Sequence, residues 1–176
     1  DLCMWDGKGF LSHTDDEGFD HGYPTCLLQD RSGKLLIGTW GGGVKILHSE
    51  NFHYYSKLFG GGLLEDKKGN IWVGSGALKD SIYTEYTVDS GPGIGGWKKL
   101  EDGLGRLWGG YYWFGVSVWD GSELVCYTKE GGLSHNTVFS LLESVDGRIW
   151  IATWGGGVNV WDGKGFTHLT TDVGMA

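Results

Sequence analysis

The chain has 176 residues, with 34 Gly, 10 Trp, 8 Tyr and 7 Phe but only 2 Pro. Residues typical of tight turns are thus combined with large side chains that pack on half-buried strands, which predicts an all-β protein and excludes collagen-like and disordered chains. The formal net charge of −8 disfavours nucleic acid and anionic membrane surfaces as partners. No apolar stretch reaches the roughly 20 residues that a membrane span needs, so we expect no membrane insertion.

The first twenty residues carry a hexapeptide that recurs near the other end of the chain. Residues Trp5–Phe10 read WDGKGF, and residues Trp161–Phe166 have the same six letters. The second copy follows the inner strands of a repeat, whereas the first copy lacks them. Residues 1–20 are therefore predicted to form the outer hairpin of an incomplete blade.

One phrase recurs four times, at spacings of 36 to 42 residues. Each copy has an apolar strand, a turn that opens with Asp or Ser, a Gly three positions later and a second apolar strand. Because Asp can bond the turn backbone and Gly can adopt positive φ, each copy predicts a hairpin. We call the residues that open these turns the anchors: Asp30, Asp66, Asp102 and Ser144.

Two further strands are expected after each hairpin. The third strand is predicted to begin fourteen positions after its anchor, at Val44, Asp80, Val116 and Val158. Glycine-rich connections, such as residues 40–43 and 154–157, lead into it. The fourth strand is predicted at Phe52–Tyr55, Leu124–Tyr127 and Phe166–Leu169.

The second copy departs from this pattern on its outer side. It offers Ser81–Tyr86 after the expected start at Asp80, and only a weak fourth strand around Val88. Units of four antiparallel strands nevertheless predict a β-propeller. Its four full repeats are expected at residues 25–57, 58–93 (irregular), 94–129 and 137–172, in addition to the hairpin.

The sequence predicts neither catalytic residues nor a metal or cofactor site. The acidic pairs Glu65–Asp66 and Glu101–Asp102 recur in the same turn, which indicates turn chemistry rather than an active site. The cysteines Cys3, Cys26 and Cys126 lack disulfide or zinc spacing and are predicted to be buried thiols. Trp72, Trp108 and Trp150 are predicted to pack between blades.

An open stack of blades leaves unpaired strand edges. The hairpin could complete the last blade of its own chain, complete a blade of a second copy, or belong to a longer array. A ring of only four blades would leave one hairpin redundant. We therefore expect self-association into a homo-oligomeric ring, or a fragment of a larger one.

Three segments resemble the two-component-regulator propeller repeat: Gly132–Val138, Asp146–Ile151 and Gly155–Val158. The resemblance implies blades of the extracytoplasmic sensor regions of bacterial hybrid histidine kinases, which sense polysaccharide breakdown products. It therefore implies a periplasmic or extracellular location. The copies that begin at Leu58 and Ile94 depart from the family pattern.

In a propeller, the connection between the second and third strands lies on the same face as the link to the next blade. Five segments are expected to share this face: 20–24, 40–43, 111–115, 134–137 and 154–157. Its flat rings suit stacking on sugars or packing against a protein partner. The candidate ligand-binding residues are Trp40, Tyr111, Tyr112, Trp113 and Trp154, with His21, His135 and Asn136 as hydrogen-bonding groups.

These features predict a non-catalytic module that binds a carbohydrate or a protein, such as a sensor-type domain. The first alternative is a propeller enzyme, a lyase or glycan-active protein, with a His and a carboxylate converging at the axis. The second is a purely structural assembly module. For any single aromatic residue, packing between blades competes with a role in binding.

Overall fold

The computed structural model describes residues 2–5, 7–13, 22–48, 51–55, 61–80, 82–86 and 95–170. These residues form four antiparallel sheets of four strands each and one two-stranded hairpin, with no helix among them. Within each sheet the strands follow one another in chain order. The protein is a β-propeller array, as the sequence predicts.

The hairpin comprises β1 (Leu2–Trp5) and β2 (Phe10–His13). Blade 1 comprises β3 (Tyr23–Gln29), β4 (Leu35–Trp40), β5 (Gly43–His48) and β6 (Asn51–Tyr55). Blade 2 comprises β7 (Leu63–Glu65), β8 (Ile71–Val73), β9 (Gly76–Lys79) and β10 (Ile82–Glu85). Blade 3 comprises β11 (Lys98–Glu101), β12 (Leu107–Gly110), β13 (Val116–Trp119) and β14 (Leu124–Tyr127). Blade 4 comprises β15 (Val138–Glu143), β16 (Ile149–Thr153), β17 (Gly157–Trp161) and β18 (Phe166–Leu169).

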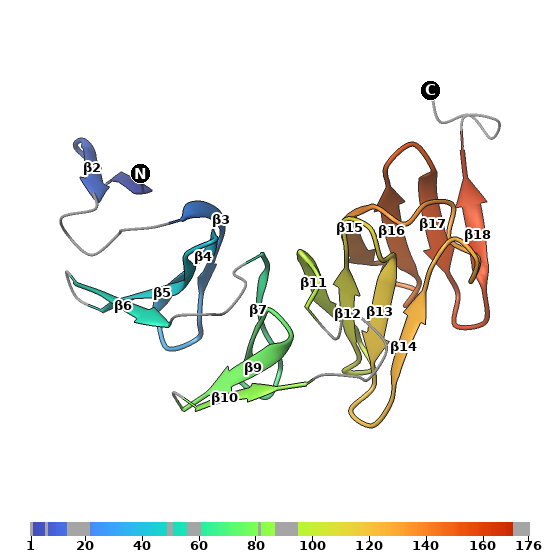
Figure 1. Ribbon diagram of the computed structural model, residues 1–176, viewed down its shortest axis with the longest axis horizontal. Coiled ribbons are helices and arrows are strands. Elements are labelled where there is room, and N and C mark those ends of the chain that lie inside the picture. Colours follow the sequence, from blue (N-terminus) through green and yellow to red (C-terminus); the bar gives the residue numbers. More distant parts are fainter. Residues whose placement is uncertain are drawn as a thin grey trace.

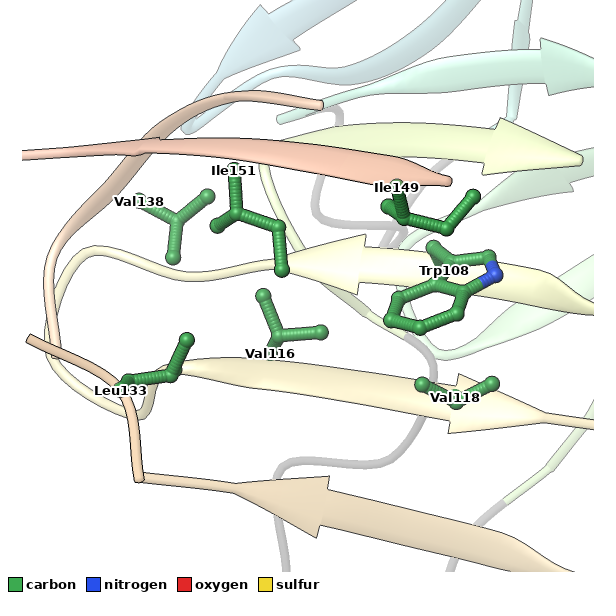
Figure 2. Packing of buried hydrophobic residues seen from close by; sticks show 7 residues of the cluster. All are labelled: Trp108, Val116, Val118, Leu133, Val138, Ile149 and Ile151. Atoms are coloured by element: carbon green, nitrogen blue, oxygen red, sulfur yellow. The ribbon is translucent and has the colours of Figure 1, made fainter. Parts of the chain in front are cut away.

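The blades follow one another through the array, with the hairpin and blade 4 at opposite ends (Figure 1). The first strands of successive blades contact each other, from β3 through β7 and β11 to β15. The hydrophobic core is divided among the interfaces between blades. Figure 2 shows Trp108 and Val118 of blade 3 packed with Ile149 of blade 4.

The anchor carboxylates organise the first hairpin of a blade. In blade 3, Oδ1 of Asp102 accepts the backbone N–H of Arg106 at 2.9 Å, and Oδ2 accepts the indole N–H of Trp108 at 2.8 Å. Asp66 accepts the indole N–H of Trp72 at the same distance. Both carboxylates and both tryptophans are buried, so the acidic pairs serve the turns and these two tryptophans are core residues.

Glutamates one position before the anchors join neighbouring blades. The carboxylate of Glu101 in blade 3 accepts the backbone N–H of Lys67 in blade 2 at 2.7 Å. The same contact recurs from Arg31 to Glu65 at 2.9 Å and from Gly103 to Glu143 at 2.8 Å. A repeated hydrogen bond therefore sets how each blade is placed on the next.

Blade 2 differs from the predicted strand positions. Gly74 and Ser75 close a short turn between β8 and β9, because Val73 pairs directly with Gly76. The third strand thus ends at Lys79, and Asp80, predicted to begin it, is a turn residue with φ of 48°. Residues 82–85 form the fourth strand, not the third. The predicted weak strand around Val88 lies outside the described residues.

The two copies of the hexapeptide form the same hairpin. Trp5 pairs with Phe10, and Trp161 pairs with Phe166. The ring centroids are 5.1 Å apart in the first copy and 4.8 Å apart in the second. The second copy packs against Tyr127 of the neighbouring blade 3.

Two other expectations can be compared with the structure. Cys3 and Cys126 are exposed and Cys26 is half-buried, so the prediction of buried thiols was wrong for the first two. Within the described ranges there is no helix of the length and apolarity that crossing a membrane requires.

Candidate ligand-binding face

The loops that follow the second strands lie beside the linker into the next blade. The linker before β15 bonds to the loop of blade 3 through Val138 N–H to the Tyr111 carbonyl at 2.7 Å and through Gly115 N–H to the Asn136 carbonyl at 2.8 Å. Trp154 N–H of blade 4 donates to the Thr137 carbonyl at 3.0 Å. Segments 111–115, 134–137 and 154–157 therefore share one face.

Glycine makes the tight path of these loops possible. Gly157, at the start of β17, has φ of 73°, and a Cβ there would lie 2.2 Å from the carbonyl oxygen of Leu169. Gly115 at the equivalent point of blade 3 has φ of 75°. Any larger residue would displace the fourth strand, so the glycines serve loop geometry rather than phosphate binding.

A continuous row of aromatic rings crosses this face. Trp40 of blade 1 lies 4.6 Å from Trp97, which lies 5.8 Å from Tyr112 of blade 3. Tyr112 lies 5.9 Å from Phe139, which lies 5.4 Å from Trp154 of blade 4. These are centroid distances typical of stabilising ring pairs. We call this row the aromatic belt: Trp40, Trp97, Tyr112, Phe139 and Trp154.

The belt is accessible at several points. Trp40 is 50% exposed, Tyr112 44% and Trp154 63%, and Trp113, whose ring lies 6.1 Å from that of Tyr112, is 71% exposed. Trp97 and Phe139 are half-buried and join the exposed rings. Large exposed rings in one row are unusual on a protein surface, so this row is the candidate binding face.

Tyr111 does not belong to this surface. It is 6% exposed, and its hydroxyl lies 3.1 Å from Oγ of Ser117. Burial raises the pKa of Tyr111 to about 12. The structure thus places this predicted site residue beneath the loop, where it supports the neighbouring Tyr112 and Trp113.

Two positions of the repeat generate the belt. Trp40, Tyr112 and Trp154 each lie ten residues after an anchor, and Trp97 and Phe139 each lie five residues before one. In blade 2 the second strand already ends at Val73, so the short Gly74–Ser75 turn provides no ring at the equivalent position. The ring of Trp97 from the next blade reaches Trp40 of blade 1 directly. Aligning the repeat at these positions would have identified the two belt residues that were not predicted.

The predicted polar residues have mainly structural partners. Nδ1 of His135 accepts the backbone N–H of Thr137 at 3.0 Å, and Oδ1 of Asn136 accepts the backbone N–H of Lys129 at 2.6 Å. Both side chains are half-buried. His21 lies outside the described residues. Any role of these three residues in binding stays a prediction.

One lysine lies beside the belt. The ammonium of Lys99, two residues after Trp97, donates to the Gly96 carbonyl at 2.8 Å. Desolvation lowers the pKa of Lys99 to about 7, although the interaction with Cys26 acts in the opposite direction. Burial therefore makes the Lys99 ammonium easier to deprotonate than an exposed lysine.

Stacking is the chemistry that this face can perform best. Its rings offer flat apolar surfaces, and the backbone of the loops holds them without helix dipoles or clustered charges. Among the residues that the structure describes, no three His, Cys, Asp or Glu side chains converge as a metal site would require. The face is thus suited to a neutral or weakly charged ligand with flat apolar surfaces.

The fold is that of a β-propeller, and one of its faces carries a row of exposed aromatic rings. Residues 132–155 match the family model described as two component regulator propeller. This match confirms the resemblance inferred from the sequence, in the part of the chain that begins at the linker before β15. No curated protein sequence matches the chain.

Solved structures of propellers match most of the chain. One is the extracellular domain assigned to a hybrid two component system of B. thetaiotaomicron, with 22% identity, a TM-score of 0.71, and coverage of 90% of this chain and 24% of that one. Another is the extracellular domain assigned to a one component system of the same organism, with 17% identity, a TM-score of 0.73 and coverage of 88% and 26%. This chain thus spans about a quarter of the length of those domains.

An enzyme also has this fold. Virginiamycin B lyase from Staphylococcus aureus matches with 14% identity and a TM-score of 0.67, over 85% of this chain and 55% of that one. At such identities the likeness concerns the fold alone.

Proposed function

We propose that the chain is a non-catalytic binding module of a sensor-type propeller that holds a carbohydrate against its aromatic belt. The observation that carries this proposal is the unbroken row of five rings across blades 1, 3 and 4. Successive rings offer successive stacking positions, which suits an oligosaccharide better than a single sugar. Hydrogen-bonded loops between strands hold the rings, so little ordering entropy is lost on binding.

The test is a screen of neutral and acidic oligosaccharides of four to eight units against the 176-residue chain, followed by calorimetry with the best binder. Replacing Trp113 or Trp154 with Ala should weaken binding about tenfold or more, because an exposed ring contributes mainly to the complex. Leu104→Ala is the control, since Leu104 is 80% exposed in a turn of blade 3 and lies outside the belt.

Unfolding in urea should show that Trp154→Ala changes stability little. Equal affinity of all three variants for the oligosaccharide would refute the proposal. A breakdown product released from the oligosaccharide by the wild-type protein would favour the enzyme alternative instead.

The sensor role and an extracellular or periplasmic location belong to the same proposal. They are supported by the family match of residues 132–155 and by the extracellular origin of the two sensor-system domains. Export of the chain in a bacterial host, followed by cell fractionation, tests the location.

We further propose that the hairpin completes a blade by self-association. Its Trp5 and Phe10 are 57% and 74% exposed, whereas the same pair in blade 4 rests on Tyr127. Light scattering behind size exclusion, across a dilution series, should give a dimer or a larger species that Trp5→Asp dissociates. A monomer at every concentration would exclude this mode of closure.

A further inference from the structure

Two of the three interfaces between blades are filled by a pair of tryptophans. Between blades 2 and 3, Trp72 of the second strand lies in one cluster with Trp119 of the third strand of the next blade, and both contact the ring of Tyr86. Between blades 3 and 4, the corresponding pair is Trp108 and Trp161. In this repeat, a second-strand tryptophan therefore receives a third-strand tryptophan from the blade that follows.

Blade 4 also carries the second-strand tryptophan of the repeat. Trp150 lies six residues after its anchor, as Trp72 and Trp108 do. Those two are 5% and 1% exposed, whereas Trp150 is only half-buried. Ile149 and Ile151 of the same strand pack toward blade 3, so Trp150 faces the other way, because neighbouring side chains in a strand alternate. Trp150 thus lies on the outer face of blade 4.

A groove of about 390 Å³ lies on this outer face. Trp150, Val160 and Thr167 are neighbours across β16, β17 and β18. Val160 is buried beneath its neighbours, whereas Trp150 is half-buried and Thr167 is exposed. The remaining lining residues are the half-buried Leu169 and, at the exposed rim, Arg148 and Asp162. The groove therefore exposes part of an indole and an aliphatic side chain within a polar rim.

The equivalent surface of blade 3 shows what fits such a groove. By strand pairing, the residues of blade 3 that correspond to Trp150, Val160 and Leu169 are Trp108, Val118 and Tyr127. Trp161 and Phe166 of blade 4 pack against this surface, with ring centroids 5.0 Å and 5.2 Å from that of Tyr127. These two residues begin and end the WDGKGF hairpin. The hairpin of a following blade is thus the element that covers such a surface.

The first copy of the hexapeptide presents the same pair of rings. Trp5 pairs with Phe10 in β1 and β2, as Trp161 pairs with Phe166 in β17 and β18. Trp5 is 57% exposed and Phe10 is 74% exposed. By its sequence this hairpin represents the third and fourth strands of a blade, which are the strands that supply both rings in blade 4. The chain therefore carries a groove at one end and a matching hairpin at the other.

We propose that the hairpin of one copy docks in the groove on blade 4 of a second copy, with Trp5 against Trp150 and Phe10 toward Leu169. The inference rests on the self-association proposed above and specifies the surface that receives the hairpin. Figure 1 places the hairpin and blade 4 at opposite ends of the array. A second copy, rather than the same chain, therefore brings the two surfaces together.

The contact joins two unlike surfaces, because each copy offers one hairpin and one groove. Such a head-to-tail contact forms a ring where the rotation closes and a filament where it does not. Two copies that exchange hairpins would be the smallest closed assembly. A copy that has lost one surface still offers the other, and this property can be tested.

The test uses two variants that each block one surface. Trp5→Asp removes the ring from the hairpin, and Thr167→Arg places a long charged side chain over the groove from an exposed position. Each variant should weaken association about tenfold or more, because an aromatic ring seated in a pocket dominates the energy of an interface. Light scattering across a dilution series measures the effect. Leu104→Arg is the control for the added charge, since Leu104 is 80% exposed in a turn of blade 3.

Mixing the two blocked variants identifies the contact. Thr167→Arg retains its hairpin and Trp5→Asp retains its groove. An equimolar mixture should therefore form dimers at a concentration at which each variant alone is monomeric. The double variant is the control, because adding it to either single variant leaves one of the two surfaces blocked in every copy and should give no dimer. Unfolding in urea verifies that each variant is folded.

The inference fails if Thr167→Arg associates as strongly as the wild type while Trp5→Asp does not. The hairpin would then bind another surface of the second copy, and the proposed self-association itself would stand. It also fails if the mixture of the two folded variants stays monomeric. A wild-type chain that is monomeric at every concentration would contradict both proposals, so the two failures are distinguishable.

Discussion

Tryptophans fill the interface between blades 3 and 4, whereas smaller leucines fill the interface between blades 1 and 2, although one repeat builds both pairs. In the first pair, Trp108 and Trp161 occupy the space between the sheets. In the second pair, the smaller side chains of Leu36 and Leu78 pack with Val44, Ile71 and Val73 in a buried cluster. The comparison teaches that the placement of two neighbouring blades does not depend on the size of the side chains between them. The glutamate hydrogen bonds recur at both interfaces, so the same docking contact serves an interface with large side chains and one with smaller side chains.

The anchor of blade 3 should be worth more than the anchor of blade 1. Asp102→Ala is expected to cost about 3 kcal/mol, because the Trp108 indole N–H and the Arg106 guanidinium both lose their acceptor. Asp30→Ala should reduce the free energy of unfolding by only about 1 kcal/mol, because Leu36, at the position of Trp108, has no side-chain donor that would lose its acceptor. Urea unfolding measures both values. Equal losses would mean that the indole bond does not distinguish the two interfaces.

Trp161→Leu removes one of the two indoles between blades 3 and 4 and makes this interface resemble the one between blades 1 and 2. It should cost about 2 kcal/mol, because the ring that packs 5.0 Å from Tyr127 leaves a cavity. Trp161→Phe is the matched control and should cost less than about 1 kcal/mol. It keeps a ring and removes a buried indole N–H that has no hydrogen-bond partner among the described residues. A smaller loss for Leu than for Phe would contradict the cavity explanation.

Much of the fold could be predicted because each copy of the repeat specifies the strands and turns of one blade. The anchor, the Gly three positions later and the apolar strands on either side are local signals, and they recur with little change. The fourth strands at Leu124–Tyr127 and Phe166–Leu169 have the predicted bounds. The third and fourth strands of blade 2 were predicted at the wrong positions, because a fixed spacing from the anchor cannot detect that Gly74 and Ser75 shorten the connection between the second and third strands.

The candidate site was harder to predict from the sequence. Trp40, Tyr112 and Trp154 could be assigned to one face from topology alone. Tyr111 and Tyr112 are adjacent letters, however, and only the closing bond from Tyr111 N–H to the Gly115 carbonyl turns one inward and leaves the other exposed. Trp97 contacts Trp40 across blade 2, and such a contact depends on how three blades stack.

The smallest expected loss of stability is that of Tyr111→Phe. This variant tests one of the two kinds of hydroxyl contact that support the loop after the second strand. At this position blades 1 and 4 have Thr39 and Thr153, whose hydroxyls donate to the carbonyls of Gly43 and Gly157. Blade 3 instead uses the Tyr111 hydroxyl with Ser117. Tyr111→Phe should cost about 1 kcal/mol at pH 8, because one buried hydrogen bond is lost.

This cost should depend on pH. Burial raises the folded-state pKa of Tyr111 to about 12, so between its ordinary value of 10 and about 12 the unfolded chain releases a proton that the folded protein retains. The stability contributed by the tyrosine is therefore fully present below pH 10 and is lost as the pH rises toward 12. Unfolding in urea from pH 8 to 11.5 should show the difference between wild type and Tyr111→Phe shrinking above pH 10. A constant difference would mean that the hydroxyl titrates freely, and that the loop of blade 3 admits water where those of blades 1 and 4 do not.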